Sequence, residues 1–430
     1  MSVLPSSGEF DPIQASSSSQ RSQALFWLVF DYALAGLTIL LSSDALNRFG
    51  ASSALWYLCY LMAMVRMVVN WQGYFALLYR NMALLLYPAV CLASLGWSPD
   101  RSGTMVSAVQ LMMTVLIAML IGGRFSLRSI CGIAYAMILI TVVLSLLNWG
   151  TGVFGTVYSP SGGLLGIYTQ KNALGQRCLI GLICGAALLL SGEARSKLFT
   201  LVVLGGMALI CVALALSLSV TSILLALPFV CLLFLMCYRR LSPVLLGSAL
   251  GIAVLVVSVL PLLLALFNFD IVAYTLGKFG KDSSLTGRTE LWSLAELILG
   301  SDWLLGVGFS AFWRAPQFAN FVLMAQNIGG EKVLGFHNFI LEIWVGSGLV
   351  GLIAMLTLLA TCIMRAARVW IRTGLVFGAW AAISSLVSVA LALLGTSLYR
   401  QHEFSIMHVV MLGVACGDIL WRSDWRSRRR

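Results

Sequence analysis

The sequence predicts an all-α, polytopic membrane protein, from its composition and its long apolar runs. Of the 430 residues, 60% are hydrophobic and 10% are charged, and the mean hydropathy is +0.96. Soluble domains carry about 25% charged residues, so this composition excludes a soluble globular protein. Apolar runs of about 20 residues, the length that crosses a bilayer as an α-helix, recur along the chain.

About twelve of these runs are predicted to be transmembrane helices, and the stretches between them define the domain organisation. We expect a disordered cytoplasmic tail over 1–23, nine helices within 24–267, a large periplasmic loop over 268–336, three helices within 337–421 and a basic cytoplasmic tail over 422–430. The runs are 24–41, 51–69, 82–97, 104–122, 130–148, 174–190, 199–215, 219–238, 243–267, 338–362, 374–396 and 405–421.

The net charge of +11 comes from 27 basic and 16 acidic residues, and its distribution argues against nucleic-acid binding. Basic residues recur in nearly every other short connection, for example at Arg80, Arg124 and Arg240. The positive-inside rule assigns such connections to the cytoplasm. The basic tail is then a topology anchor, and we expect no nucleic-acid partner.

The ten cysteines all lie within or at the ends of predicted spans, and no Cys/His spacing typical of a metal site occurs. This pattern predicts small buried hydrophobic side chains, with neither a disulfide framework nor a bound metal or other cofactor. Asp31 and Arg66 are charged residues within predicted spans, where each needs a partner or a snorkelling side chain. Pairing with each other is one arrangement that satisfies both, and a structural role is favoured over a catalytic one.

The large loop contains a predicted amphipathic helix from Arg288 to Leu299, because apolar residues recur there at i, i+3, i+4 and i+7. Those residues are Leu291, Leu294, Ala295 and Ile298. Gly300 is a plausible terminator of the helix. Arg288 lies in the first turn, where exposed N–H groups and the helix dipole already favour an anion, so this turn is a candidate phosphate site. The alternative is a solvated arginine paired with Asp282 or Glu290.

His337 follows at the start of the tenth predicted span, where the loop returns to the membrane. A histidine with a near-neutral pKa at this boundary can take a proton from a hydroxyl, although it could also be only an interfacial polar cap. Gly346, Gly348 and Gly351 predict close helix packing behind it. The last outer connection, 399–403, adds charge at Arg400 and Glu403.

Two further outer segments carry candidate substrate-binding residues. A predicted helix that follows a glycine-rich stretch begins with the polar residues Lys171, Asn172, Gln176 and Arg177. Either these side chains bind a ligand, or they are simply the solvated end of the helix. The short connection 217–222 has four hydroxyls, including Ser219 and Thr221. These could line a polar cleft, but capping of the following helix is the simpler interpretation.

In order and spacing, the segments 166–175, 286–292 and 305–308, with His337-Asn338 before a glycine-rich helix, resemble the O-antigen ligase and Wzy-type polymerase superfamily over about 145–365. The resemblance implies a GT-C-like helical fold and metal-independent transfer of a glycan from an undecaprenyl-diphosphate donor to an acceptor hydroxyl. It maps Arg288 to a diphosphate-binding arginine and His337 to the residue that activates the acceptor.

One departure concerns the residue after Ser219, where ligases usually place an arginine and this chain has Val220-Thr221. This version is similar to the exopolysaccharide-polymerase branch. It leaves open which cation completes the diphosphate site, and Lys171, Arg177 and Arg400 are the candidates.

The resemblance therefore implies a bacterial inner-membrane polymerase that acts at the periplasmic face. The expected partners are an undecaprenyl-diphosphate-linked oligosaccharide, membrane lipid, a chain-length regulator and export proteins. One alternative is a ligase that moves finished glycan onto lipid A-core or another acceptor. A lipid-linked sugar transporter is a remote alternative, because the two halves of the chain show no matching repeat.

Overall fold

A computed structural model describes residues 18–50, 52–160, 162–192, 196–238, 288–329, 335–336, 338–393 and 398–427. Within these residues the secondary structure is helical, apart from one isolated bridge between Tyr158 and Leu164. The α-helices are α1 (Ser18–Ser42), α2 (Ser52–Val69), α3 (Trp71–Arg80), α4 (Leu86–Ala93), α5 (Arg101–Arg124), α6 (Leu127–Thr151), α7 (Lys171–Leu190), α8 (Lys197–Ser217), α9 (Val220–Cys237), α12 (Arg288–Asp302), α13 (Ala319–Gly329), α14 (Phe339–Thr373), α15 (Val376–Leu393) and α16 (Phe404–Ser427).

Ten of the described helices are long and apolar enough to cross a membrane, or up to 11 if one bent pair forms a single span. That pair joins Trp71–Arg80 to Met82–Gly96 with a bend of 84°. The polytopic all-α class predicted from the sequence is confirmed. The predicted span over 243–267 lies outside the described residues, and α3 was not predicted as a helix. α1 begins at Ser18, within the stretch predicted as a tail.

The chain divides into two compact units. Unit 1 contains 1–89, 108–237 and 354–430, and unit 2 contains 90–107 and 238–353. Three helices, α4, α5 and α14, contribute residues to both units. Each unit is described separately below.

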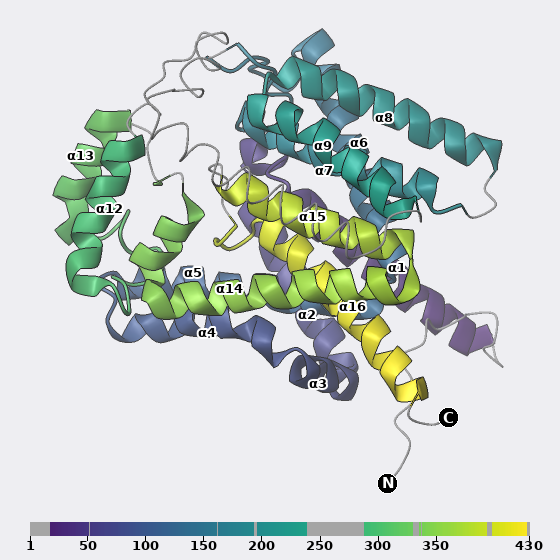
Figure 1. The fold of residues 1–430 in the computed structure, drawn as a ribbon, viewed down its shortest axis with the longest axis horizontal. Helices are drawn as coiled ribbons and strands as arrows, with labels where there is room; N and C mark the ends of the chain where they lie inside the picture. The colour runs from purple at the N-terminus through teal and green to yellow at the C-terminus, as the bar shows by residue number, and fades with distance from the viewer. Residues whose placement is uncertain are drawn as a thin grey trace. The chain divides into compact units, whose positions relative to one another are not determined.

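Unit 1 is built around α7, which contacts α6, α8, α9 and α15 (Figure 1). In the apolar window of this helix, 78% of the residues are buried, the highest share among the candidate spans. Small residues make this burial possible, because a Cβ at Gly175 would lie 2.5 Å from the Cβ of Ser219 on the neighbouring helix turn. Such close backbone approach is typical of transmembrane helix contacts.

Asp31 and Arg66, the two charged residues within predicted spans, form an ion pair inside unit 1. Arg66 Nε donates to Asp31 Oδ1 at 2.7 Å, and both side chains are buried. Arg124, from α5, adds a second cation at 2.9 Å from Asp31 Oδ2. The pairing considered from the sequence is therefore confirmed, and Arg124 is a third member that was not predicted.

Unit 2 has its own core, centred on the amphipathic helix α12. Its four periodic residues are all buried, with exposed fractions of 1%, 6%, 0% and 6%. They pack against Phe312, Phe336 and Val345, which come from the following loop and the first half of α14. The predicted amphipathic helix is thus confirmed, and it ends at Asp302, two residues beyond the predicted terminator Gly300.

A glycine turn at 305–308 joins the parts of unit 2. Gly306 and Gly308 have positive φ of 69° and 108°. Trp97 Nε1 donates to the Gly306 carbonyl at 3.1 Å, and Val307 N donates to the Val345 carbonyl at 2.8 Å. Because only glycine adopts these backbone angles readily, the turn can contact both Trp97, in the connection before α5, and α14.

Gly348 interrupts α14 with φ 68° and ψ −172°. A Cβ at this position would lie 2.5 Å from the carbonyl carbon of Leu305, within the same turn. Of the three glycines predicted to pack closely against a helix, Gly348 does pack closely, but its neighbour is the glycine turn, and Gly346 has no neighbour closer than 3.8 Å. The helix is kinked at the point where the turn rests against it.

Candidate functional site

The junction of α12 and α14 in unit 2 contains the segments predicted to react. Trp292 Nε1 donates to the Phe336 carbonyl at 3.0 Å. The Phe336 N–H donates to Glu342 Oε1, and Trp313 Nε1 donates to Glu342 Oε2 at 3.2 Å. The Phe336 ring is fully buried beside Trp313, with centroids 4.9 Å apart. Phe336 is therefore held at its N–H, its carbonyl and its ring.

Asn338 fixes the other side of the same junction. Its Oδ1 accepts from Ile340 N at 3.1 Å, and its carbonyl accepts from Glu342 N at 3.0 Å, so it caps α14. His337 lies between Phe336 and Asn338 in sequence but outside the described residues. The structure therefore pins the residues on both sides of the predicted base.

Arg288 is the first residue of α12, and its side chain is outside the described part of the chain. Trp292 lies four residues further on, which is about 6 Å along a helix. Since Trp292 bonds the carbonyl that precedes His337, the helix that starts at Arg288 lies beside that segment. The meeting of the Arg288 and His337 side chains stays a prediction.

Arg177 is the centre of a second cluster, in unit 1 at the predicted outer ends of its helices. It lies in the second turn of α7 with an exposed fraction of 4%. Its Nε donates to the Ser43 carbonyl at 3.3 Å, and its guanidinium lies 4.3 Å from the centre of the Phe404 ring. The carboxylates of Asp44 and Glu403 are close enough to act on its charge. A buried arginine in such a setting is held rigidly.

The neighbours of Arg177 on α7 differ in their accessibility. Lys171 is half-buried. It packs closely on Gly163 of the glycine-rich stretch, where an added Cβ would lie only 2.7 Å from Lys171 Cδ. Gln176 is half-buried and Asn172 is exposed. All four predicted residues therefore lie on the first two turns of one helix, as the sequence indicated, and Arg177 is the one enclosed by protein.

The hydroxyl-rich connection between α8 and α9 is compact. Ser217 Oγ accepts from Ser219 N at 3.2 Å, and Ser219 Oγ bonds Ser222 Oγ at 3.1 Å. Ser219 is 1% exposed, whereas Thr221 is half-buried. These bonds fit the capping interpretation better than a polar cleft, because the Ser219 hydroxyl is used within its own turn.

The turn before α16 carries Arg400 and His402. Arg400 Nε donates to the Tyr399 hydroxyl at 2.8 Å. The His402 ring stacks on Trp56 at 4.1 Å and hydrogen-bonds the Tyr60 hydroxyl. Desolvation by burial lowers the pKa of His402 to about 4, so its imidazole is neutral at physiological pH.

Sequence reasoning missed three members of the unit 1 cluster. Asp44 has φ 73° and accepts from the Thr169 hydroxyl. Arg48 donates to the Gly166 carbonyl at 2.9 Å and the Thr156 carbonyl at 2.6 Å, which ties down the glycine-rich stretch. Tyr168 is fully buried and donates to Thr141 Oγ1 at 2.8 Å. Burial raises the pKa of the Tyr168 hydroxyl, so it stays protonated as a donor.

Backbone strain gathers around this cluster. Asp44, Leu218 and His402 have φ of 73°, 48° and 64°, the left-handed region that non-glycine residues rarely adopt. Each lies in a short turn between two helices of unit 1. Residues held in this region concentrate at functional sites. The cluster around the buried Arg177 is therefore a candidate site of unit 1.

Comparison with known proteins bears on the junction of α12 and α14, which lies within the matched range. Residues 205–356 match the family model described as O-antigen ligase. The chain is also 30% identical over 276 residues to "Exopolysaccharide production protein ExoQ" of Rhizobium meliloti (strain 1021). That alignment covers 62% of this chain and 60% of the relative, so it spans less than two thirds of the relative's length. Residues 205–356 therefore match the O-antigen ligase family, and the resemblance of the sequence to the O-antigen ligase and Wzy-type polymerase superfamily is confirmed.

Proposed function

We propose that this protein is a glycan polymerase of the bacterial inner membrane, which joins undecaprenyl-diphosphate-linked repeat units of an exopolysaccharide at the periplasmic face. The observation that carries the proposal is the match of residues 205–356 to the O-antigen ligase family, because that range contains both Arg288 and His337. The relative is named for exopolysaccharide production, which favours that class of product.

The proposed reaction is a direct displacement at the anomeric carbon of the donor sugar. The acceptor hydroxyl oxygen forms the new bond to this carbon while the bond from the carbon to the diphosphate oxygen breaks. The electron pair of the broken bond leaves with the diphosphate, and the configuration inverts. His337 takes the hydroxyl proton, and Arg288 neutralises the charge that grows on the leaving group.

The geometry of unit 2 supports this division of roles. The bond from Trp292 to the Phe336 carbonyl brings the helix that starts at Arg288 next to the segment that carries His337. Lys171, Arg177 and Arg400 are the candidates for a second cation on the diphosphate. Asn172, Gln176 and Thr221 are the proposed glycan-binding residues beside them, whereas Ser219, which the sequence also suggested, is buried with its hydroxyl bonded to Ser222.

The test is a reconstituted reaction with a purified lipid-diphosphate oligosaccharide. Wild-type protein in proteoliposomes is expected to make longer chains, and His337→Ala and Arg288→Ala are expected to lower the rate about a hundredfold or more. Lys197→Ala, which removes an exposed cation at the start of α8, is the matched control and is expected to leave the rate unchanged. Polymer of normal length and yield from His337→Ala would refute the assignment of the base.

A ligase is the second candidate, because the matching family model is described as O-antigen ligase. A ligase transfers finished glycan to a different acceptor molecule. The same preparation separates the two activities: a polymerase extends chains from lipid-linked repeat units alone, whereas a ligase makes product only after a second acceptor is added.

A further inference from the structure

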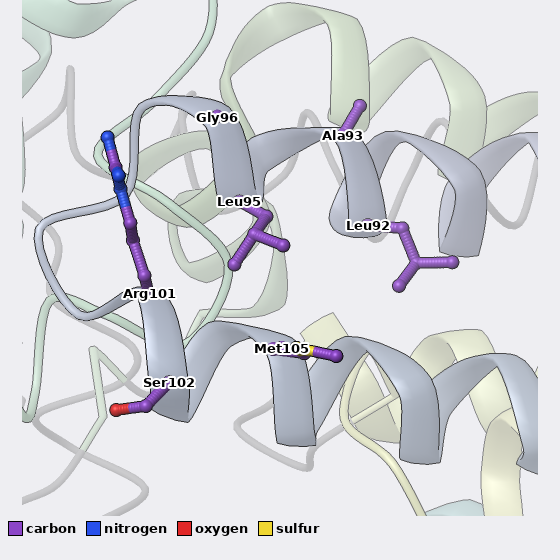
Figure 2. Close-up of a pocket in the computed structure, with 7 residues that line it drawn as sticks. All are labelled: Leu92, Ala93, Leu95, Gly96, Arg101, Ser102 and Met105. Atoms are coloured by element: carbon purple, nitrogen blue, oxygen red, sulfur yellow. The ribbon is translucent and has the colours of Figure 1, made fainter.

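A hollow in unit 2 lies between the end of α4 and the beginning of α5. It has a volume of about 620 Å³ (Figure 2). Its lining consists of Leu92, Ala93, Leu95, Gly96, Arg101, Ser102 and Met105. The side chains of Leu92 and Leu95 point across it toward α5, and Arg101 stands at the end where the chain turns.

The two segments that flank the hollow are expected to contribute to membrane crossings. Arg101–Arg124 is a candidate span, and Met82–Gly96 is the second half of the bent pair that qualifies as a span only together with Trp71–Arg80. Trp97, in the turn between them, is 37% exposed, and tryptophan concentrates at the membrane–water interface. We therefore expect Arg101 to lie near the lipid phosphates, with the apolar Leu95 and Met105 side chains next to the lipid chains.

The mouth of the hollow carries one excess positive charge. Asp100 is already engaged, since its Oδ2 lies 3.2 Å from Arg314 Nε and its Oδ1 accepts from Gly103 N at 3.0 Å. Among the described residues no carboxylate pairs with Arg101, whose side chain is exposed. Two guanidinium groups against one carboxylate leave a net +1 (2 − 1), which complements an anionic headgroup.

This mouth is joined rigidly to the rest of unit 2. Ser94 Oγ accepts from Phe309 N at 3.0 Å, and Thr104 Oγ1 donates to the Phe309 carbonyl at 3.0 Å. Together with the bond from Trp97 to Gly306, these contacts fix both sides of the hollow to the glycine turn. The same turn packs on α12 through Val307.

We infer that this hollow binds the polyprenyl chain of the lipid-linked substrate, with the phosphate next to that chain held by Arg101 and the Ser102 hydroxyl. A hollow lined by one row of residues from each of two helix ends suits a single isoprenoid chain better than the paired chains of a diacyl lipid. The inference rests on the proposed function, because it assigns a place to the lipid of that substrate.

The experiment measures binding of a long-chain polyprenyl phosphate to the purified full-length protein by native mass spectrometry. Arg101→Gln and Ser102→Trp are expected to weaken binding about tenfold, by loss of a charge-assisted contact and by blocking the mouth. Val109→Trp, on α5 but outside the hollow, is the matched control and is expected to bind normally. Because Arg101 and Ser102 are exposed, their variants should fold, and an unchanged thermal midpoint checks this.

Phosphatidylglycerol tests the choice of lipid. An excess of it is expected to leave the bound polyprenyl phosphate in place. Equal displacement would overturn the inference in favour of a general anionic-lipid surface, and so would normal polyprenyl phosphate binding by both mouth variants. If wild-type protein makes polymer while both variants bind and work normally, only the hollow is wrong. If wild-type protein binds the lipid as expected but yields no glycan product, only the proposed function is wrong.

Discussion

Trp292 and Trp344 form the same kind of hydrogen bond in unit 2, with different consequences for the proposed site. Trp292 Nε1 donates to the carbonyl of Phe336, next to His337, at 3.0 Å. Trp344 Nε1 donates to the Trp303 carbonyl at 2.7 Å, in the glycine turn region. The two bonds are matched in chemistry, so a comparison of their loss isolates the effect on the site.

Trp292→Phe removes the first bond and keeps a large ring in the core. We expect a loss of about 1 kcal/mol in stability, the ordinary net value of one hydrogen bond. We also expect at least a tenfold loss of polymer formation, because small misplacements of a reacting group lower rates strongly. The measurements are thermal midpoint and product yield with lipid-linked repeat units.

Trp344→Phe is the control for this prediction. It should lower stability by a similar amount and leave polymer formation close to that of the wild type. Equal losses of activity in the two variants would show that Trp292 supports only the fold of unit 2.

His402 makes stability depend on pH. Its pKa is about 4 in the folded protein, because burial disfavours the charged imidazole, against 6.5 for an unperturbed histidine. Between these two values the unfolded state binds more protons, so stability falls as the pH is lowered from about 6.5 to 4. The slope from this group is at most about 1.4 kcal/mol per pH unit.

His402→Asn is expected to flatten that part of the profile, since asparagine tolerates the left-handed backbone that His402 adopts. Thermal midpoints of wild type and variant in detergent, between pH 7 and 4.5, should approach each other at the acid end. Other groups titrate in this range, so the difference between the two curves is the quantity to compare. Parallel curves would contradict a buried neutral imidazole.

At the scale of elements, alanine substitutions at Gly348 and Gly346 of α14 test two different effects. The first tests the special backbone geometry, and the second tests helix propensity alone. Gly348 has φ 68° and ψ −172°, a region essentially reserved for glycine, and its Cβ position lies against Leu305. Gly346→Ala would place its Cβ 3.8 Å from the nearest neighbouring atoms, among them Phe309 Cα. The two glycines lie two residues apart on α14.

Gly348→Ala is expected to cost about 3 kcal/mol, from the forced backbone region and the overlap with the glycine turn. Gly346→Ala is expected to change stability by less than about 1 kcal/mol. Thermal midpoints of purified variants check both values. A tolerated Gly348→Ala would mean that α14 does not need its kink.

The elements show what periodicity predicts and what it leaves open. The spacing of Leu291, Leu294, Ala295 and Ile298 predicted the buried face of α12, because apolar side chains that far apart share one side of a helix. Gly300 did not end the helix, since a single glycine only lowers helix propensity. α3 escaped prediction because its ten residues are too few to cross a bilayer.

The site was less predictable than the helices. Lys171 to Arg177 could be placed at the start of a helix, but Asp44 lies in a short polar turn that has no periodic signal. The bond between Trp292 and Phe336 joins residues 44 apart, and its acceptor is a backbone carbonyl that carries no mark in the sequence. The pairing of Arg124 with Asp31 was missed for the same reason, because it depends on how the helices pack and leaves no pattern in the sequence.

For the whole molecule, the distribution of charge predicts an orientation that chemistry can test. Ser102 lies at the predicted periplasmic end of α5 and Ser423 near the predicted cytoplasmic end of α16, and both are exposed. A membrane-impermeant maleimide is expected to label Ser102→Cys in intact spheroplasts and Ser423→Cys only after permeabilisation. The unsubstituted protein is the control for its ten native thiols. The opposite pattern would invert the topology and with it the face on which the reaction occurs.

The triad of Asp31, Arg66 and Arg124 has a consequence for biosynthesis. Asp31 emerges from the ribosome 35 residues before Arg66 and 93 residues before Arg124. At ordinary translation speeds, the second interval lasts roughly 5 to 20 seconds. Arg66 alone can balance the charge of Asp31, so the first helix carries an unpaired acidic group only until the second helix has been made. The complete triad forms later, when Arg124 of α5 joins the first two helices, which makes early assembly a cooperative event among three segments.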